Sequence, residues 1–564
     1  MHTLDWIVLT ASLVFIVAYG VWKGRGSKDI AGYFLADKSM RWYTILLSIM
    51  ATQASAITFL SVPGQAFVDG MRFVQFYFGL PLAMIILCIT FVPIFHRLKV
   101  YTAYEFLENR FDLKTRGLAS LLFLTQRGLA AGLTIYAPAL ILSVILGWDL
   151  YLTNLLMGGM VIIYTASGGT RAVNWTHSYQ MLIIFLGMLA AFAVLLYHLP
   201  GDISFLEATH VAGKMGKLNA IDFSFDLNNR YTVWSGILGG LFLQLSYFGT
   251  DQSQVQRYLT GRSIAQSRMG LLLNGMVKIP MQFFILFIGA MLFVFYQFEA
   301  PPVFFNSVET GKIRASQYAE EFSELERQYE AAAAEKEARV RELVSALRSG
   351  DEARIGAAER SLAQAQEAAL ATRSQAVEVL RANDPGMDPK DTNYIFLSFV
   401  TRYLPVGLVG LVIAAIIAAS MSSTAAELNA LASTTIVDIY RRILRKEDSE
   451  KQYVGASKIA TVLWGVYAII FAESASRLGS LVEAVNILGS LFYGTILGIF
   501  LVAFYLKRIG GSAVFYAAFV AEAAVLYCFF FTDISFLWYN VVGCAGVVLV
   551  STLLHPFLKK KTRS

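Results

Sequence analysis

RWYTILLSIMATQASAITFLSVPG, residues 41–64, is the stretch that decides the fold of this 564-residue chain. A run of this kind is long enough to cross a bilayer, which takes about 20 mostly apolar residues. Its middle, ATQASA at 51–56, is small and polar. We expect the helix to unwind there, which exposes backbone carbonyls. Because such carbonyls are tolerated at membrane depth only where they line a cavity or hold an ion, the stretch predicts a broken helix beside a polar site.

A second run, TVWSGILGGLFLQLSYFGTDQSQ at 232–254, repeats this pattern. Its small and polar positions are Gln244, Ser246, Gly249, Asp251 and Gln252. The two runs are the first members of two successive groups of five apolar segments. Paired interruptions at corresponding places predict an inverted-repeat transporter with a binding site near the bilayer midplane. Packing of small residues between helices is the alternative interpretation.

The composition around these runs is that of a polytopic helical membrane protein. Hydrophobic residues make up 56% of the chain and charged residues 15%, whereas soluble domains average about 25% charged residues. These values exclude an ordinary soluble enzyme, a disordered protein and a secreted disulfide scaffold. The net charge of +6 gives no reason to expect a nucleic-acid partner, and the lipid bilayer is the expected surroundings. Cys88, Cys528 and Cys544 lie in apolar runs and are expected to be small buried hydrophobes.

Apolar runs predict about thirteen membrane spans. Lys and Arg gather after every odd-numbered span, and by the positive-inside rule this places the N-terminus outside and the C-terminus in the cytoplasm of a cell (inner or plasma) membrane. The predicted spans are 4–23, 41–64, 74–96, 117–146, 150–167, 176–198, 232–251, 269–297, 396–425, 454–474, 479–506, 511–531 and 535–556.

The order of the spans predicts how the chain is divided. Residues 1–30 hold a leading transmembrane helix, and 31–300 hold the first repeat and the start of the second. Residues 301–392 form an insertion, 393–510 complete the second repeat, and 511–564 hold two trailing transmembrane helices and a basic cytoplasmic tail.

The insertion contains a charged, Ala-rich segment at 312–383 that does not fit a membrane. It lacks Pro and is rich in good helix formers, with a turn signal at Ser349-Gly350-Asp351. The pattern predicts an extracellular or periplasmic helical hairpin, since the segment follows span eight. A tolerated surface insertion is one interpretation. A docking arm for a protein partner, or an oligomer contact, is the other.

Polar residues inside the apolar runs are the candidate functional residues. Ser422 and Ser423 offer adjacent hydroxyls within AASMSSTAAELNALASTTIVDIY (418–440), and hard cations such as Na⁺ favour oxygen ligands. Two hydroxyls in a membrane helix can also serve as helix contacts or bond back to the backbone. Intramembrane ionisable groups indicate substrate or coupling roles, although each can instead snorkel or pair structurally. These groups are Arg127, His177, Asp251, Lys278 and Glu483.

The chain resembles the solute:sodium symporter family, most closely the branch of the iodide, monocarboxylate and multivitamin transporters. The resemblance rests on SAITFLSVPGQAF (55–67), YTAYEFLENRF (101–111), TIYAPALIL (134–142), YTASGGTRAVNWTHSYQ (164–180), DQSQVQRYLTGRS (251–263) and the 418–440 stretch. It implies an all-α fold of the LeuT type, in which two five-helix repeats are inverted relative to each other. It also implies Na⁺-coupled import of a small solute by alternating access, with Na⁺ as the coupling ion.

The resemblance also implies site residues. The Na⁺ site of the family corresponds here to the carbonyls of Ala51, Ala54 and Ala419 and the hydroxyls of Ser422 and Ser423. The substrate cavity of the family corresponds to Gln53, Gln75, Phe76, Tyr77, Gln244, Asp251 and Asn486.

One departure from the family bears on the ion count. Relatives with a second Na⁺ use an Asp in a Trp-Thr-Asp motif and hydroxyl residues after the Ser pair. Here the motif reads Trp175-Thr176-His177, and Ala425 and Ala426 follow the Ser pair. We therefore expect one Na⁺ per transport cycle.

The predicted solute is a neutral polar molecule, a sugar or a related nutrient, because amides, a phenol and a carboxylate offer hydrogen-bond donors and acceptors. Three alternatives remain open: a proton-coupled transporter that uses Asp251 or His177, a carrier of an organic or inorganic anion, and a sensor that signals through the hairpin without transport. An enzyme is not expected, because the sequence has no metal-ligand cluster, nucleophile elbow or phosphate-binding glycine loop.

Overall fold

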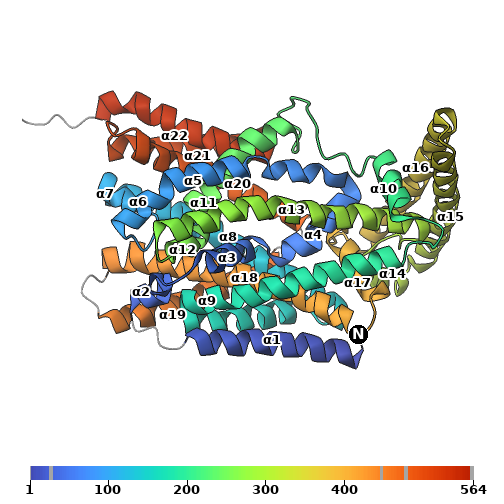
Figure 1. Ribbon diagram of the computed structural model, residues 1–564, viewed down its shortest axis with the longest axis horizontal. Coiled ribbons are helices and arrows are strands. Elements are labelled where there is room, and N and C mark those ends of the chain that lie inside the picture. Colours follow the sequence, from blue (N-terminus) through green and yellow to red (C-terminus); the bar gives the residue numbers. More distant parts are fainter. Residues whose placement is uncertain (1, 25–28, 445–448, 475–479, 559–564) are drawn as a thin grey trace, which may run out of the picture.

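The computed structural model describes residues 2–24, 29–444, 449–474 and 480–558. Within these ranges the protein is built from helices and contains no strand longer than one isolated bridge, between Met40 and Gly261. Most helices run side by side along the long axis of the molecule, and two helices cross one of its ends (Figure 1).

The helices before the insertion are α1 (Thr3–Gly24), α2 (Ile30–Leu35), η1 (Ala36–Lys38), α3 (Trp42–Gln53), α4 (Ala56–Asp69), η2 (Gly70–Tyr77), α5 (Leu80–Ile89), α6 (Phe91–Leu98), α7 (Glu105–Arg110), α8 (Leu113–Leu146), α9 (Leu150–Tyr197), α10 (Phe205–Lys214), η3 (Ser235–Gly239), α11 (Gly240–Gly249), α12 (Gln252–Leu259) and α13 (Ile264–Phe298).

The insertion and the second half contain α14 (Ser307–Arg314), α15 (Ala319–Ser349), α16 (Glu352–Asn383), η4 (Thr392–Tyr394), α17 (Ile395–Tyr403), α18 (Leu408–Thr434), η5 (Thr435–Leu444), α19 (Glu450–Ala472), α20 (Leu481–Tyr505), α21 (Gly511–Phe531) and α22 (Phe536–Leu558).

Both predicted helix breaks are present. The helix of the first run stops at Gln53 and restarts at Ala56, with Ala54 in a non-helical conformation (φ −84°, ψ 66°). In the second run α11 ends at Gly249 and α12 begins at Gln252, so that Thr250 and Asp251 lie in the break. The Asp251 carboxylate caps α12 by accepting from the Ser253 backbone N–H at 2.8 Å. Each break therefore frees backbone groups in the middle of the bundle.

Helix α9 contains a reversal of the chain at Gly169. This residue has φ +54°, and a Cβ placed on it would lie 2.5 Å from the carbonyl oxygen of Tyr33, so only glycine fits. Tyr164 before the reversal and Thr176 after it both lie against Gly20 of α1. The two legs of α9 therefore run side by side, and they supply the fifth and sixth predicted spans.

Ten helical runs of the described chain are long and apolar enough to cross a membrane. This number is smaller than the predicted thirteen or so for three reasons. One run, Ala56–Leu98, joins the second half of a broken span to the next span. The run Leu150–Tyr197 contains both legs of α9, and each half of the α11–α12 span is too short to count. The polytopic all-α fold of the sequence-based prediction is confirmed.

The predicted hairpin is present as α15 and α16. Gly350 ends α15 in a left-handed conformation (φ +68°), and Asp351 caps α16 by accepting from the backbone N–H groups of Ala353 and Arg354 at 2.9 and 3.2 Å. Part of the buried seam is formed by Phe322, Leu325, Tyr329, Ala369, Ala376 and Leu380. The hairpin lies across one end of the bundle (Figure 1).

The tip of the hairpin is fastened to α10 and to the turn before it. Arg348 pairs with Glu207 at 2.6 Å, Arg341 pairs with Asp202 at 3.0 Å, and Lys214 pairs with Glu359 at 2.7 Å. The hairpin therefore does not project freely from the bundle.

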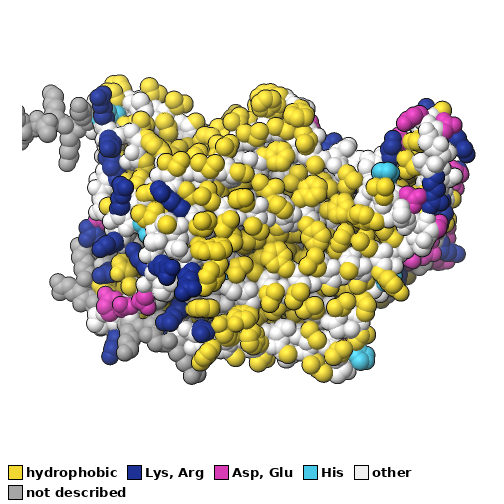
Figure 2. Space-filling model, in the orientation of Figure 1, with side chains coloured by type: hydrophobic (Ala, Val, Ile, Leu, Met, Phe, Trp, Pro, Cys, Tyr) yellow, Lys and Arg dark blue, Asp and Glu magenta, His cyan; other side chains and the backbone are white. Residues whose placement is uncertain are grey.

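The surface of the bundle agrees with a membrane-embedded protein. The face seen in Figure 2 is largely hydrophobic along the bundle, and Lys and Arg gather on it at the end opposite the hairpin. The hairpin carries both signs of charge at the other end. The protein is an integral membrane protein, and the charged residues mark the two ends of its apolar belt.

Candidate functional site

The predicted Na⁺ ligands meet where the first break faces α18. The Ser422 hydroxyl donates to the Ala51 carbonyl at 2.9 Å and lies 2.7 Å from the Ala419 carbonyl. The Ser423 hydroxyl lies 3.0 Å from the same Ala419 carbonyl. Ala54, the remaining predicted ligand, forms the break itself. Neutral carbonyl and hydroxyl oxygens are the donors that a hard cation prefers, so these groups fit Na⁺.

His177 is buried directly behind this cluster. Its Nε2 lies 3.0 Å from the Ser422 carbonyl oxygen, and its Nδ1 lies 3.0 Å from the Ser48 hydroxyl. Nε2 must carry the proton, because a carbonyl oxygen only accepts. The imidazole from α9 thus connects α18 to α3. Ala425 and Ala426, which follow the Ser pair, are both buried and offer no side-chain oxygen.

A cavity of about 100 Å³ lies next to the Ser423 side of the cluster. Its polar lining comes from both broken spans and from α8, α13, α18 and α20. Predicted substrate residues that line it are Gln53, Phe76, Tyr77, Gln244 and Asn486. Arg127 and Lys278, predicted as coupling residues, line it as well.

Gln75 does not line the cavity, contrary to the sequence-based expectation. Its amide nitrogen donates to the Tyr231 carbonyl at 2.8 Å, and its amide oxygen accepts from the Asp222 backbone N–H at 3.0 Å. The side chain therefore holds the loop before η3 against η2. The sequence predicted that residues 75–77 line the cavity, but it could not show that the side-chain amide of Gln75 points away from it.

Asp251 also lies outside the cavity lining, because its two carboxylate oxygens are already engaged. One oxygen caps α12, and the other accepts from Arg127 and from the Tyr493 hydroxyl. Arg127 makes a second ion pair, with Glu427 at 3.0 Å. The predicted intramembrane charges Arg127 and Asp251 are therefore partners of each other.

Glu427 and Tyr493 are site residues that were not predicted from the sequence. Both line the cavity, and the second carboxylate oxygen of Glu427 has no hydrogen-bond partner among the described residues. A signal for Glu427 was available, because it is the only acidic residue in LVGLVIAAIIAASMSSTAAELNALAST, the sequence of α18. Nothing in the sequence distinguished Tyr493 from the other aromatic residues of α20.

Lys278 faces the cavity from α13. The side chain is 1% exposed, and its Nζ has no hydrogen-bond partner among the described residues. The ring of Tyr77 lies beside it, with its centroid 5.6 Å from Nζ. A buried ammonium group without a carboxylate is costly, so the arrangement favours a ligand that brings a negative or strongly polar group to this side of the cavity.

Broken helices, a cluster of carbonyl and hydroxyl oxygens and an adjoining polar cavity define a secondary transporter rather than an enzyme. The chain belongs to the sodium:solute symporter family, whose model matches residues 33–317 and 376–520. The resemblance drawn from the motifs is therefore confirmed. Members of the family are sodium-coupled transporters. Residues 318–375, most of the hairpin, lie outside the match.

The relatives fall into two groups by coverage. A sodium-dependent multivitamin transporter of Oryctolagus cuniculus is 34% identical over 300 residues, which are 52% of this chain and 46% of the relative. This chain therefore spans about half the length of such relatives. A sodium/sialic acid symporter of Proteus mirabilis is 25% identical over 561 residues, 98% of this chain and 95% of the relative.

A solved structure of a Na⁺-coupled sialic acid symporter has the same fold, with a TM-score of 0.75 and 23% sequence identity. The similarity covers 99% of this chain and 98% of that protein.

Proposed function

We propose that this protein imports a small, hydroxyl-rich organic solute together with Na⁺ by alternating access. The contact between the Ser422 hydroxyl and the Ala51 carbonyl, 2.9 Å long and adjacent to the cavity, carries the proposal. Na⁺ in this cluster would replace hydrogen bonds between hydroxyls and carbonyls with bonds to the ion. It would thereby tie the broken helix of one repeat to α18 of the other.

One Na⁺ per cycle is our proposed stoichiometry. The support is the place of His177, which fills the space behind the cluster with an imidazole bonded to Ser422 and Ser48. The hydroxyls that relatives offer to a second ion are methyl groups at Ala425 and Ala426. A membrane potential of 100 mV contributes about 2.3 kcal/mol per charge, so a single ion can drive accumulation.

The solute we propose is a sugar-like molecule that carries a carboxylate. An unpaired carboxylate at Asp251 would repel an anionic solute. That objection weakens because Asp251 is paired with Arg127, while Lys278 has no carboxylate partner among the described residues. The amides of Gln53, Gln244 and Asn486 suit hydroxyl groups. Two relatives that match nearly the whole chain are named as sialic acid symporters, so sialic acid is the first solute to test.

We propose that the N-terminus and the hairpin lie outside, with the Lys- and Arg-rich end in the cytoplasm. The distribution of charge between the two ends supports this orientation. On the hairpin side of the cavity, Arg230 holds Glu483 of α20 with two contacts of 2.7 Å, one helical turn from Asn486. We assign to this ion pair the role of closing the outer entrance.

The hairpin is proposed as a strap over the outer end rather than as a free docking arm. The ion pairs between its tip and α10 support this role. A protein partner or a second copy of the chain would have to use the remaining exposed faces of α15 and α16.

Uptake of radiolabelled sialic acid into proteoliposomes tests the function. We expect accumulation under an inward Na⁺ gradient and none in Na⁺-free buffer with an inward proton gradient. Uptake driven by protons alone would favour the proton-coupled alternative. Binding without accumulation under either gradient would favour a sensor.

A further inference from the structure

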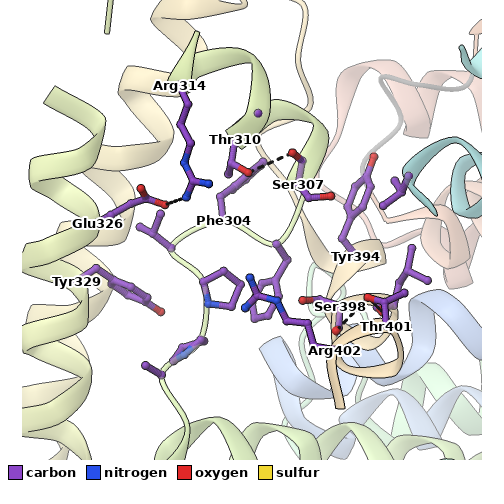
Figure 3. Close-up of a pocket in the computed structure, with 18 of the residues that line it drawn as sticks. Phe304, Ser307, Thr310, Arg314, Glu326, Tyr329, Tyr394, Ser398, Thr401 and Arg402 are labelled. Atoms are coloured by element: carbon purple, nitrogen blue, oxygen red, sulfur yellow. Dashed lines mark hydrogen bonds and ion pairs between the residues drawn. The ribbon is translucent and has the colours of Figure 1, made fainter. Parts of the chain in front are cut away.

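A second cavity, of about 340 Å³, lies at the base of the hairpin (Figure 3). It shares no lining residue with the central cavity. One wall comes from Glu326, Tyr329 and Glu330 of α15, which belong to the part of the chain outside the family match. The cavity is therefore a feature that the inserted hairpin adds to this transporter.

The frame of this cavity is fixed by buried polar contacts. Asp391 accepts from the Phe305 backbone N–H at 2.7 Å and pairs with Arg373 of α16 at 2.6 Å. These contacts join the loop after α13, the hairpin and the segment before α17. Asn306 caps α14 by accepting from the Val308 backbone N–H at 3.1 Å. Because three separate segments are tied together here, the cavity is a built feature and not a gap between loose loops.

Arg402, an exposed residue, brings a positive charge to the cavity lining, and Glu330 of the α15 wall brings a negative one. The Arg402 guanidinium enters from the α17 side, facing the α15 wall that carries Glu326 and Tyr329 (Figure 3). Arg314, the other guanidinium in the lining, is neutralised by Glu326 at 2.8 Å. Arg402 has no ion-pair partner within the described residues. A planar guanidinium in this situation selects a carboxylate, which it can bind through two parallel hydrogen bonds.

The remaining lining suits the body of a sugar. Phe304, Tyr329 and Tyr394 supply aromatic surfaces, and Ser307 and Thr310 supply hydroxyl groups. Aromatic walls with a few polar groups are typical of small-molecule sites, and the volume lies at the lower end of their usual range of about 300–1,000 Å³. That size accommodates one monosaccharide ring and excludes a folded protein segment.

We propose that this cavity is an outer binding site for a carboxylated monosaccharide, with Arg402 holding the carboxylate and the aromatic residues contacting the ring. The site lies at the hairpin end of the molecule, so a solute arriving from outside meets it before the central cavity. The choice of solute class rests on the proposed function, but the site is separate from the Na⁺-coupled one. It binds its ligand independently of Na⁺.

Equilibrium binding to the purified full-length protein tests the proposal. The probes are radiolabelled sialic acid and glucuronate, with glucose as the neutral control, each measured with and without Na⁺. Wild-type protein should bind two molecules of sialic acid, one of which requires Na⁺. Asn486→Trp, which fills the central cavity, should keep only the Na⁺-independent site. Arg402→Gln should weaken that site about tenfold or more and leave the Na⁺-dependent site unchanged.

The controls separate this proposal from the proposed function. Arg402→Lys, which keeps the charge, should restore part of the affinity, and Arg381→Gln, an exposed arginine of α16 away from the cavity, should have no effect. The absence of any Na⁺-independent binding, or Na⁺-independent binding that Arg402→Gln does not change, overturns the outer site. Binding of glucose as tight as that of glucuronate also overturns it. Loss of Na⁺-dependent binding alone counts against the proposed function and leaves the outer site standing.

Discussion

The central pair Arg127–Glu427 and the hairpin pair Arg341–Asp202 have the same N–O distance, 3.0 Å, but opposite surroundings. The side chains of Arg127 and Asp251 are 4% and 0% exposed, whereas those of Arg348 and Glu207 are 51% and 20% exposed. Water and salt screen the second pair but not the first. Each buried charge has already lost its hydration, so removing its partner leaves an uncompensated charge at membrane depth. Burial, and not the contact distance, therefore decides how much an ion pair contributes to the stability of the protein.

Arg127→Met should produce the largest effect. It leaves Asp251 and Glu427 buried without their counter-charge, a situation that costs about 3–5 kcal/mol in comparable buried pairs. We expect a large fall in the thermal unfolding temperature of the detergent-purified protein, or failure to accumulate in the membrane.

The matched control is Arg339→Met, which breaks two exposed ion pairs on α15, with Glu335 and Glu342. It should leave the unfolding temperature unchanged. Adding Asp251→Asn and Glu427→Gln to Arg127→Met should recover part of the lost stability, because the buried charges then disappear together. Equal effects of Arg127→Met and Arg339→Met on the unfolding temperature would show that burial does not decide the contribution of these ion pairs.

Ser423→Ala should have the next largest effect, on Na⁺ rather than on folding. The variant removes one hydroxyl ligand of the Na⁺ cluster without leaving a buried charge. We expect the Na⁺ concentration for half-maximal uptake to rise about tenfold, which corresponds to about 1.4 kcal/mol, while the unfolding temperature in Na⁺-free buffer stays the same. The control is Ser433→Ala, a buried serine on the same helix whose hydroxyl bonds back to the Ala430 carbonyl at 2.9 Å. Unchanged Na⁺ dependence in Ser423→Ala would count against the site.

Lys336 extends the comparison, because it is a buried charge in a hairpin whose charged residues are mostly exposed. Burial, with the charge of Arg373 nearby, lowers the pKa of Lys336 to about 8. The unfolded hairpin, with a lysine pKa of about 10.4, holds this proton more tightly than the folded one. The stability of the hairpin should therefore rise with pH between those two values.

Replacing this lysine tests the effect directly. Lys336→Met should slow hydrogen exchange in α15 and α16 at pH 7, with a gain on the order of 1–3 kcal/mol. The gain should shrink by pH 9, where the wild-type lysine has lost its proton in the folded state. Lys390→Met, an exposed lysine near the hairpin, serves as the control. A gain that does not change with pH would show that side-chain packing, and not the charge, is responsible.

Arg348→Ala should have the smallest effect, because its pair with Glu207 is exposed. We expect exchange at the hairpin tip to accelerate by less than about fivefold. Hydrogen bonds from Arg348 and Ser204 lower the pKa of Glu207 to about 2. Since the unfolded value is about 4.3, the contribution of the pair should be present above that pH and vanish as the pH falls toward 2. Asp391→Asn, which removes a buried contact at the base of the hairpin, should accelerate exchange more. Equal acceleration in Arg348→Ala and Asp391→Asn would contradict this ranking.

Periodicity and local chemistry predicted most of the fold. The polar ATQASA segment marked the first break, and the Ser349-Gly350-Asp351 turn marked the hairpin, because both are local signals. Side-chain direction and long-range pairing could not be predicted. The amide of Gln75 faces a loop that lies about 150 residues further along the chain, and Arg127 finds Glu427 across 300 residues of sequence. Both outcomes depend on tertiary packing, which a single sequence does not encode in any local pattern.

The proposed Na⁺ site is best tested by the stoichiometry of radioactive Na⁺ binding to the purified protein, which requires no knowledge of the solute. We expect one Na⁺ per protein, with binding strongly weakened by Ser422→Ala or Ser423→Ala and retained in Ser433→Ala. Binding of two ions, or of one ion whose affinity neither serine variant changes, would contradict it.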